Sequence, residues 1–194
     1  MEMAQSIGNE SMCRTAAAIS VLSRAELGLP LAAAPAELVS SEPKREGDFA
    51  MMSQVISEAL LALGDLERAE QIARYAYEHA AGRLREMLSA LALGNVLLRL
   101  GSPHLSEAEH VYDQAITLAE TLGARLPLTI AHLGAGELAA ARGDPATGAR
   151  HLRQALTLCR ELGLARYQPR AERLLADMAP VTTFEGSAAH GADG

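Results

Sequence analysis

The sequence predicts an all-α protein built from repeated helix pairs, and three observations support this prediction. The chain has 194 residues, of which 49% are hydrophobic but only 3% are aromatic, and it contains no Trp. Its core must therefore consist mainly of Leu, Ala and other aliphatic side chains, and Leu and Ala both have a high helix propensity. The second and third observations are two series of glycines that recur in phase along the chain.

The first series consists of glycines that close apolar helical stretches, 36, 37 and 42 residues apart: Gly28, Gly64, Gly101 and Gly143. Each is followed by a small residue five to seven positions later, and the last three by an Ala a further seven positions on: Ala33, Ala69, Ala108, Gly148, Ala76, Ala115 and Ala155. Gly ends a helix in the left-handed conformation at little cost. The small residues predict antiparallel helices that approach closely.

The second series ends three related segments, EMAQSIGNE, TLAETLGAR and TLCRELGLA, with Gly8, Gly123 and Gly163. The interval from Gly8 to Gly28 equals that from Gly123 to Gly143, at 20 residues. The stretch between the two markers is therefore predicted to be the first helix of the next unit.

The phase of the glycines predicts first helices at 11–27, 48–63, 83–100 and 125–142, and second helices at 31–40, 66–81, 105–122 and 145–162. A final helix at 166–178 is expected to cover the last pair. Asp65 and Asp144 are predicted to cap the second helices that follow them, and Pro145 fits a first helical turn. Residues 40–47 are predicted to be a loop. Residues 180–194 are predicted to be a disordered tail after a helical domain spanning 1–179.

One stretch carries a family resemblance in Leu93-Gly94-Asn95, Leu97, Ala108, Tyr112 and Ala115. It resembles a tetratricopeptide repeat (TPR), as does the segment from Gly64 to Ala76, and the resemblance covers roughly residues 3–178. The likeness implies a right-handed α-solenoid of about four helix pairs plus a C-terminal capping helix. The long units are also similar to the C-terminal TPR arrays of bacterial regulators of the LuxR, maltose-activator and cyclase-associated types.

The TPR resemblance implies a concave partner-binding groove lined by the first helices. Its positions in this chain are Gln54, Glu58, Leu61, Leu91, Asn95, Leu98, Arg99, Ile130, Leu133 and Glu137. Among these positions only Arg99 is basic, whereas Glu58 and Glu137 are acidic. We therefore expect a protein or peptide partner of apolar or basic character, held as a helix or an extended segment.

The sequence contains no motif that would support catalysis. It has no P-loop, no GxSxG, no HExxH and no Cys/His spacing for a metal, and no two of its six histidines stand four residues apart on a helix. His132 is the best candidate if any histidine is functional. We therefore expect a non-catalytic protein without a cofactor or metal.

Charge and composition bear on partners and location. The net charge of −7 argues against nucleic acid as a partner, and no run of about 18 apolar residues exists to span a membrane. Cys13 and Cys159 are expected to be buried thiols in a reducing compartment. We expect a cytoplasmic protein.

The repeat phase places residues 1–10 at the end of a second helix, so the array begins within a unit. Either the chain is a fragment of a longer regulator, or its first helix pairs with another chain through Met12, Ala16, Ile19 and Leu22. Three functions follow as hypotheses: an interaction scaffold, an effector-sensing region of a regulator, and a self-assembly module that forms a homodimer.

Overall fold

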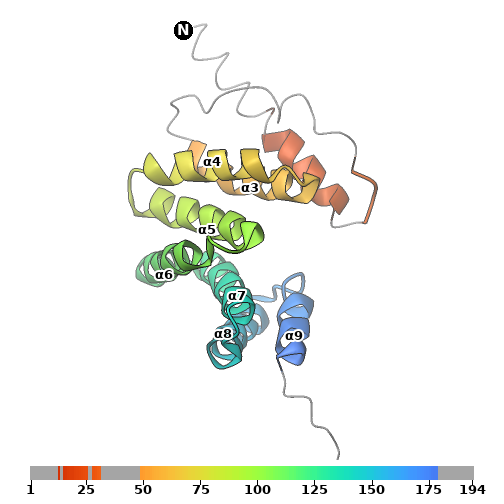
Figure 1. Ribbon diagram of the computed structural model, residues 1–194, viewed down its shortest axis with the longest axis vertical. Coiled ribbons are helices and arrows are strands. Elements are labelled where there is room, and N and C mark those ends of the chain that lie inside the picture. The colour runs from red at the N-terminus through yellow and green to blue at the C-terminus, as the bar shows by residue number, and fades with distance from the viewer. Residues whose placement is uncertain (1–12, 14, 26–27, 32–48, 179–194) are drawn as a thin grey trace, which may run out of the picture.

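The computed structural model describes residues 13, 15–25, 28–31 and 49–178, and helix is the only regular secondary structure in these ranges (Figure 1). Residues 15–25 are helical. The later helices are α3 (Phe49–Leu63), α4 (Leu66–Glu78), α5 (Arg83–Leu100), α6 (Leu105–Leu122), α7 (Arg125–Ala141), α8 (Pro145–Leu162) and α9 (Gln168–Asp177). The prediction of an all-α protein is confirmed for the described residues.

The predicted boundaries agree closely with these helices, and α5, α6 and α8 match them at both ends. The largest difference is at α4, which ends three residues early, with His79 at its C-cap; the ring nitrogen Nδ1 of His79 lies 2.8 Å from the carbonyl oxygen of Tyr75. Helix α9 starts two residues late, and Pro169 lies in its first turn. The predicted helix at 31–40, the loop at 40–47 and the tail at 180–194 lie outside the described residues, apart from residue 31 itself.

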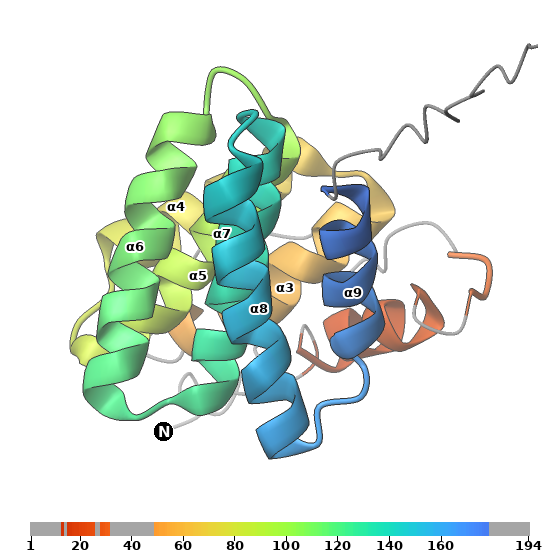
Figure 2. The same cartoon turned by 90° about the horizontal axis from the view of Figure 1, so that it is seen from below.

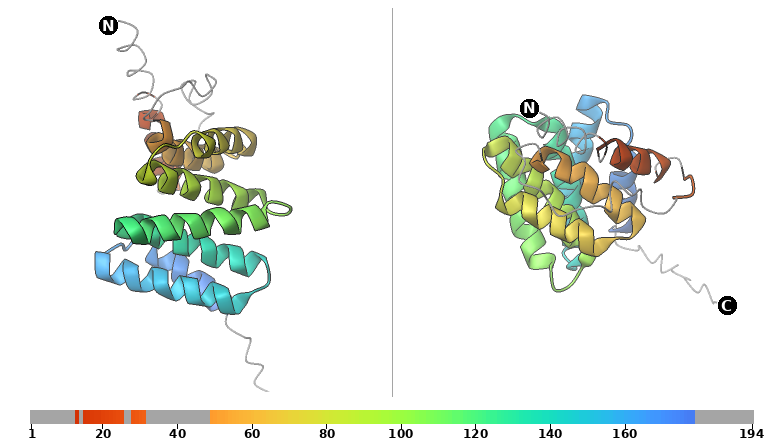
Figure 3. Two further views of the ribbon diagram at one scale, coloured as in Figure 1. Left: turned by 90° about the vertical axis from the view of Figure 1, so that its left-hand side faces the viewer. Right: turned by 90° about the horizontal axis from the view of Figure 1, so that it is seen from above.

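The helices stack in chain order from α3 to α9 (Figures 1 and 3). Successive helices pack against each other, and in addition α3 packs on α5 and α5 on α7. The first helices of successive pairs are therefore neighbours along the stack. Figure 2 looks along the stack from its C-terminal end and shows α9 beside α8, on the side away from α6.

Small residues allow the paired helices to approach closely, as the repeat predicted. A methyl group on Gly94 of α5 would lie 2.9 Å from Cε1 of Tyr112 on α6. A methyl group on Gly136 of α7 would lie 2.6 Å from Cγ of Leu152 and 3.2 Å from the backbone oxygen of Gly148, both on α8. Side chains at these glycines would therefore force the pairs apart.

The ends of the helices carry the predicted caps. Asp65 accepts a hydrogen bond from the backbone N–H of Arg68, and Asp144 accepts one from that of Thr147, so each satisfies an N–H of a first turn. Gly123 ends α6 with φ 64° and ψ 24°, in the left-handed region that favours glycine.

The core runs through most of the stack and is aliphatic apart from Tyr112. It joins the helix at 15–25 to α3, α4, α5, α6 and α7, and a second group of buried side chains joins α7, α8 and α9. The prediction of buried thiols is confirmed for Cys159 and wrong for Cys13, which is exposed. Burial raises the pKa of the Cys159 thiol.

Candidate functional site

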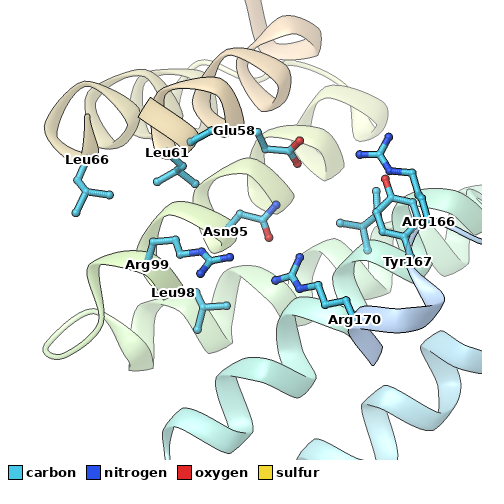
Figure 4. Close-up of a pocket in the computed structure, with 11 residues that line it drawn as sticks. Glu58, Leu61, Leu66, Asn95, Leu98, Arg99, Arg166, Tyr167 and Arg170 are labelled. Carbon is cyan, nitrogen blue, oxygen red and sulfur yellow. The ribbon is translucent and has the colours of Figure 1, made fainter. Parts of the chain in front are cut away.

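A cavity of about 420 Å³ opens along the first helices of three successive pairs (Figure 4). Its lining comes from α3, α5 and α7, from the start of α4, and from the turn that leads into α9 together with the first residues of that helix. The lining residues are Glu58, Leu61, Ala62, Leu66, Asn95, Leu98, Arg99, Ile130, Arg166, Tyr167 and Arg170. The cavity thus lies where the sequence placed a groove.

Six of the predicted groove residues line the cavity directly: Glu58, Leu61, Asn95, Leu98, Arg99 and Ile130. Two others lie next to the lining and bond to it. The Nε2 atom of Gln54 donates to Oε1 of Glu58 over 3.4 Å, and Glu137 forms ion pairs with Arg99 and Arg170.

Leu91 and Leu133 do not reach the cavity, and the prediction that they contact a partner is wrong. They are 0% and 1% exposed, respectively. Leu91 belongs to the main core, and Leu133 packs with Leu152 of α8 and Ala171 of α9. Both side chains fill space between helices, so no ligand can touch them without separating the stack.

The amide of Asn95 has a fixed orientation. The hydroxyl of Tyr112 donates to Oδ1 of Asn95 over 2.7 Å, and Tyr112 is fully buried between α5 and α7. The amide accepts this bond through its oxygen, so the N–H donors of Nδ2 are not used by Tyr112. Burial, the largest cause, and nearby Glu137 raise the pKa of Tyr112, so it stays protonated and keeps donating.

Two arginines meet at one carboxylate beside the cavity. Nη2 of Arg170 bonds to Oε2 of Glu137, and Nη1 of Arg99 lies 3.9 Å from the other oxygen, Oε1. The Glu137 side chain is only 23% exposed, so it holds both guanidiniums from below the cavity surface. In Figure 4 the two guanidiniums lie beside the Asn95 amide, whose oxygen is on their side and whose nitrogen is on the side of Glu58.

Sequence reasoning missed Arg166, Tyr167 and Arg170, because it treated the last helix only as a cover. The guanidinium of Arg166 lies 4.8 Å from the centre of the Tyr167 ring, immediately before α9 begins. The repeat phase held the signal that could have found these residues. A helix that follows the last pair occupies the place of a further first helix, so its early residues face the same groove.

The arginines of α9 change the charge balance of the site. The expectation of an apolar or basic partner assumed that Arg99 was the single basic residue of the groove. That assumption is wrong, since Arg166 and Arg170 also line the cavity. Glu137, which was counted as an available acid, is paired with two arginines.

His132, the histidine favoured by the sequence, lies in a buried pair away from the cavity lining. Its Nδ1 is 3.0 Å from Nδ1 of His151 on α8. The guanidinium of Arg150 lies 3.1 Å from Nε2 of His151 and can only donate, so His151 carries its proton on Nδ1 and donates to His132. Burial first, then the neighbouring His151 and Arg150, lower the pKa of His132 to about 4.

The predicted self-association face is only partly exposed. Ala16 is exposed and Ile19 is 52% exposed, whereas Leu22 is half-buried and packs against the main core. Met12 lies outside the described residues.

Metal-binding clusters and membrane-spanning helices are both absent from the described residues. No three His, Cys, Asp or Glu side chains among the described residues gather as they would around a metal ion. None of the described helices combines the length and apolarity needed to cross a bilayer.

The chain matches no protein-family model, and a search of curated proteins finds no relative. The case for function therefore depends on the geometry of the cavity and on the sequence pattern.

Proposed function

We propose that this chain is a non-catalytic protein-interaction module of the TPR kind, a right-handed solenoid of about four helix pairs and a capping helix. The cavity along α3, α5 and α7 would hold a peptide segment or a helix of a partner protein. The observation that carries the proposal is the coincidence of this cavity with six groove positions inferred from the TPR pattern.

The lining has the mixture of groups that peptide recognition requires. Leu61, Leu98 and Ile130 provide apolar surface, and each is half-buried. Asn95 and the arginines provide hydrogen-bond donors at fixed positions. Apolar surface with a few convergent polar groups is typical of binding sites, and about 420 Å³ falls within their usual range.

A pair of matched substitutions tests the proposal. Short fluorescein-labelled peptides of acidic, basic and apolar composition are titrated with the full chain and followed by fluorescence anisotropy. Leu98→Glu places a charge in the cavity, whereas Leu126→Glu places the same charge on a leucine that is 44% exposed outside it. We expect Leu98→Glu to weaken binding of the best peptide about tenfold, a loss of roughly 1.4 kcal/mol.

Leu126→Glu is expected to leave that affinity unchanged, with circular dichroism confirming that both variants fold. If no peptide of any class binds, or if both variants bind like the parent chain, the cavity is not a peptide site and the proposal is wrong.

A second candidate is an effector-sensing region of a bacterial regulator, favoured by the size of the cavity, which also suits a small molecule. Here a small ligand binds the isolated chain and raises its melting temperature by mass action. A thermal-shift screen with metabolites separates this candidate from the first, because a peptide site responds to none of them.

A homodimer through the first helix is the third candidate, carried by the exposed side chain of Ile19. Light scattering over a range of protein concentrations tests it. Ile19→Asp is expected to hold the chain as a monomer if this face pairs two copies.

A further inference from the structure

The exposed faces of α6 and α8 correspond residue by residue. Gly123 and Gly163 end these helices in the same left-handed conformation, so each residue of α6 has its equivalent in α8 40 positions later. Thr117 and Thr157 are equivalent and exposed, and the hydroxyl of each donates to the backbone carbonyl four residues earlier. The two faces therefore have a similar local structure.

The charged side chains on either side of these threonines differ in sign. Asp113 and Glu120 are exposed on α6, and their equivalents on α8, Arg153 and Arg160, are exposed as well. None of these four side chains forms an ion pair with another part of the described chain. One helix thus presents two free carboxylates and the other presents two free guanidiniums at the same positions.

The remaining carboxylates of α6 and α8 already have partners within the chain. The pairs are Glu107 with Arg74, Glu109 with Arg142 and Glu161 with Arg125. Each pair joins a helix to a neighbouring part of the stack. Asp113 and Glu120 take no part in holding the stack together, so their charge remains available to a second molecule.

The two faces are neighbours on one surface of the molecule, outside the large cavity. Asp113 of α6 lines a recess of about 40 Å³ together with Thr147 and His151 of α8. Short turns reverse the chain before and after α7, so α6 and α8 run in the same direction (Figures 2 and 3). Neither helix contributes a residue to the lining of the large cavity. An acidic strip and a basic strip therefore lie side by side.

We propose that this surface pairs two copies of the chain, with α6 of each copy against α8 of the other. A twofold axis parallel to the two helices and midway between them produces both contacts at once, as an isologous interface requires. This rotation keeps the height of each residue along its helix. Asp113 then meets Arg153 of the second copy, and Glu120 meets Arg160 of the second copy. The two charges are seven residues apart on both helices, or about 10 Å, so both pairs form together.

The charge pattern also decides against other arrangements. If α6 met α6, or α8 met α8, like charges would face each other, which is costly at an interface. A partner of a single charge would suit one strip and be repelled by the other, whereas a second copy matches both. Thr117 and Thr157 lie between the charged positions, and their small side chains allow the helices to approach.

The dimer is independent of the proposed function and adds to it. Since α6 and α8 lie outside the cavity lining, both cavities of the dimer remain open. Two cavities held together raise the avidity for a partner that carries two binding segments. Exposed ion pairs are individually weak, so we expect a dimer that dissociates on dilution.

Two charge-reversed variants of the full chain test the pairing by sedimentation velocity over a range of protein concentrations. The acidic variant carries Arg153→Glu and Arg160→Glu, and the basic variant carries Asp113→Arg and Glu120→Arg. We expect each variant alone to dimerise about a hundredfold more weakly than the parent chain, because like charges then meet at every contact. An equimolar mixture is expected to form a heterodimer about as tight as the parent dimer, because every contact again joins opposite charges.

Controls separate this interface from general effects of charge. Arg83→Glu combined with Arg173→Glu makes the same change of charge as the acidic variant, at exposed positions on α5 and α9, and should leave the dimer unchanged. The basic variant has a smaller net negative charge than the parent, so overall repulsion alone predicts that it associates more strongly. Circular dichroism checks that each variant folds.

The inference is wrong if the parent chain stays monomeric at every concentration, or if both variants dimerise as it does. It is also wrong if Ile19→Asp alone abolishes the dimer, since the copies then pair through the first helix. A monomeric parent that binds an acidic peptide through Arg153 and Arg160 would assign these arginines to another protein. None of these outcomes changes the affinity of peptides for the cavity, so the proposed function is tested separately.

Discussion

The pair α5–α6 and the pair α7–α8 occupy equivalent places in the repeat but are packed by different side chains. In the first pair the ring of Tyr112 lies over Gly94, and in the second Leu152 lies over Gly136. The aromatic ring is long enough to reach a third helix, where it packs against Gly134 of α7. One buried side chain, Tyr112, thus connects the pair α5–α6 to α7. Leu152, by contrast, packs with buried side chains of α7, α8 and α9.

The residue after each helix glycine also differs. Asn95 follows Gly94 and is held by Tyr112, whereas Glu137 follows Gly136 and is held by Arg170. One position therefore provides a fixed donor and the other an anchor for cations. Successive helix pairs thus place different polar groups at one cavity or next to it.

A third difference lies on the buried side of the same helices. The repeat places His132 where α5 has Ala90, and His151 where α6 has Val111. The first pair is apolar at this contact, and the second contains two histidines joined by a hydrogen bond. The two polar side chains at this contact thus satisfy each other.

The largest expected effect concerns the contact between Tyr112 of α6 and Gly134 of α7. A methyl group on Gly134 would lie 2.5 Å from Cε1 of Tyr112, which is buried and cannot move aside. Gly134→Ala is therefore expected to lower the free energy of unfolding by about 3 kcal/mol, measured by urea denaturation. In a Tyr112→Leu background, which copies the α7–α8 pair, the same change should instead stabilise by up to about 1 kcal/mol, because Ala is the better helix former.

Gly136→Ala is the control for this coupling, since its methyl group would meet Leu152 and not Tyr112. Gly136→Ala should lower the free energy of unfolding by the same amount whether position 112 is Tyr or Leu. Equal costs of Gly134→Ala in both backgrounds would show that Tyr112 does not bridge the two pairs.

The next effect is a dependence of stability on pH that comes from the histidine pair. The pKa of His132 is about 4 in the folded chain and 6.5 in the unfolded chain, so the unfolded state takes up a proton first as the pH falls. The contribution is complete above pH 6.5 and is lost between pH 6.5 and pH 4. At about 1.4 kcal/mol per pKa unit, and with relaxation around a charged ring, we expect a loss of about 2 kcal/mol.

The double variant His132→Ala, His151→Val gives the α7–α8 pair the residues of the α5–α6 pair. Denaturation curves measured at several pH values should lose their slope between pH 6.5 and pH 5, where few carboxylates titrate. A variant that kept the slope of the parent chain would place the pH dependence elsewhere.

Features that depend on a few neighbouring residues, such as the ends of helices, could be predicted from the sequence. Helix ends follow from Gly and Asp at fixed places, so α5, α6 and α8 agree with the predicted bounds. Side chains that depend on the packing of several helices were harder to place. Leu91 shares a helix face with Asn95, but the packing of α3 and α7 decides that it is buried. Arg170 and the histidine pair depend on contacts between helices, which no spacing within one helix contains.

The smallest expected effect compares the starts of the second helices. Asp65 caps α4 through the N–H of Arg68 at 3.2 Å, whereas the N-cap residue of α6, His104, makes no side-chain capping bond. Asp65→Ala should therefore cost about 1 kcal/mol in thermal or urea unfolding, and His104→Ala much less. Asp65→Asn keeps an acceptor oxygen and loses only the exposed ion pair with Arg68, so most of the stability should return. If Asp65→Asn is as harmful as Asp65→Ala, charge at this helix end matters more than the hydrogen bond, and the caps of the repeat act through the helix dipole.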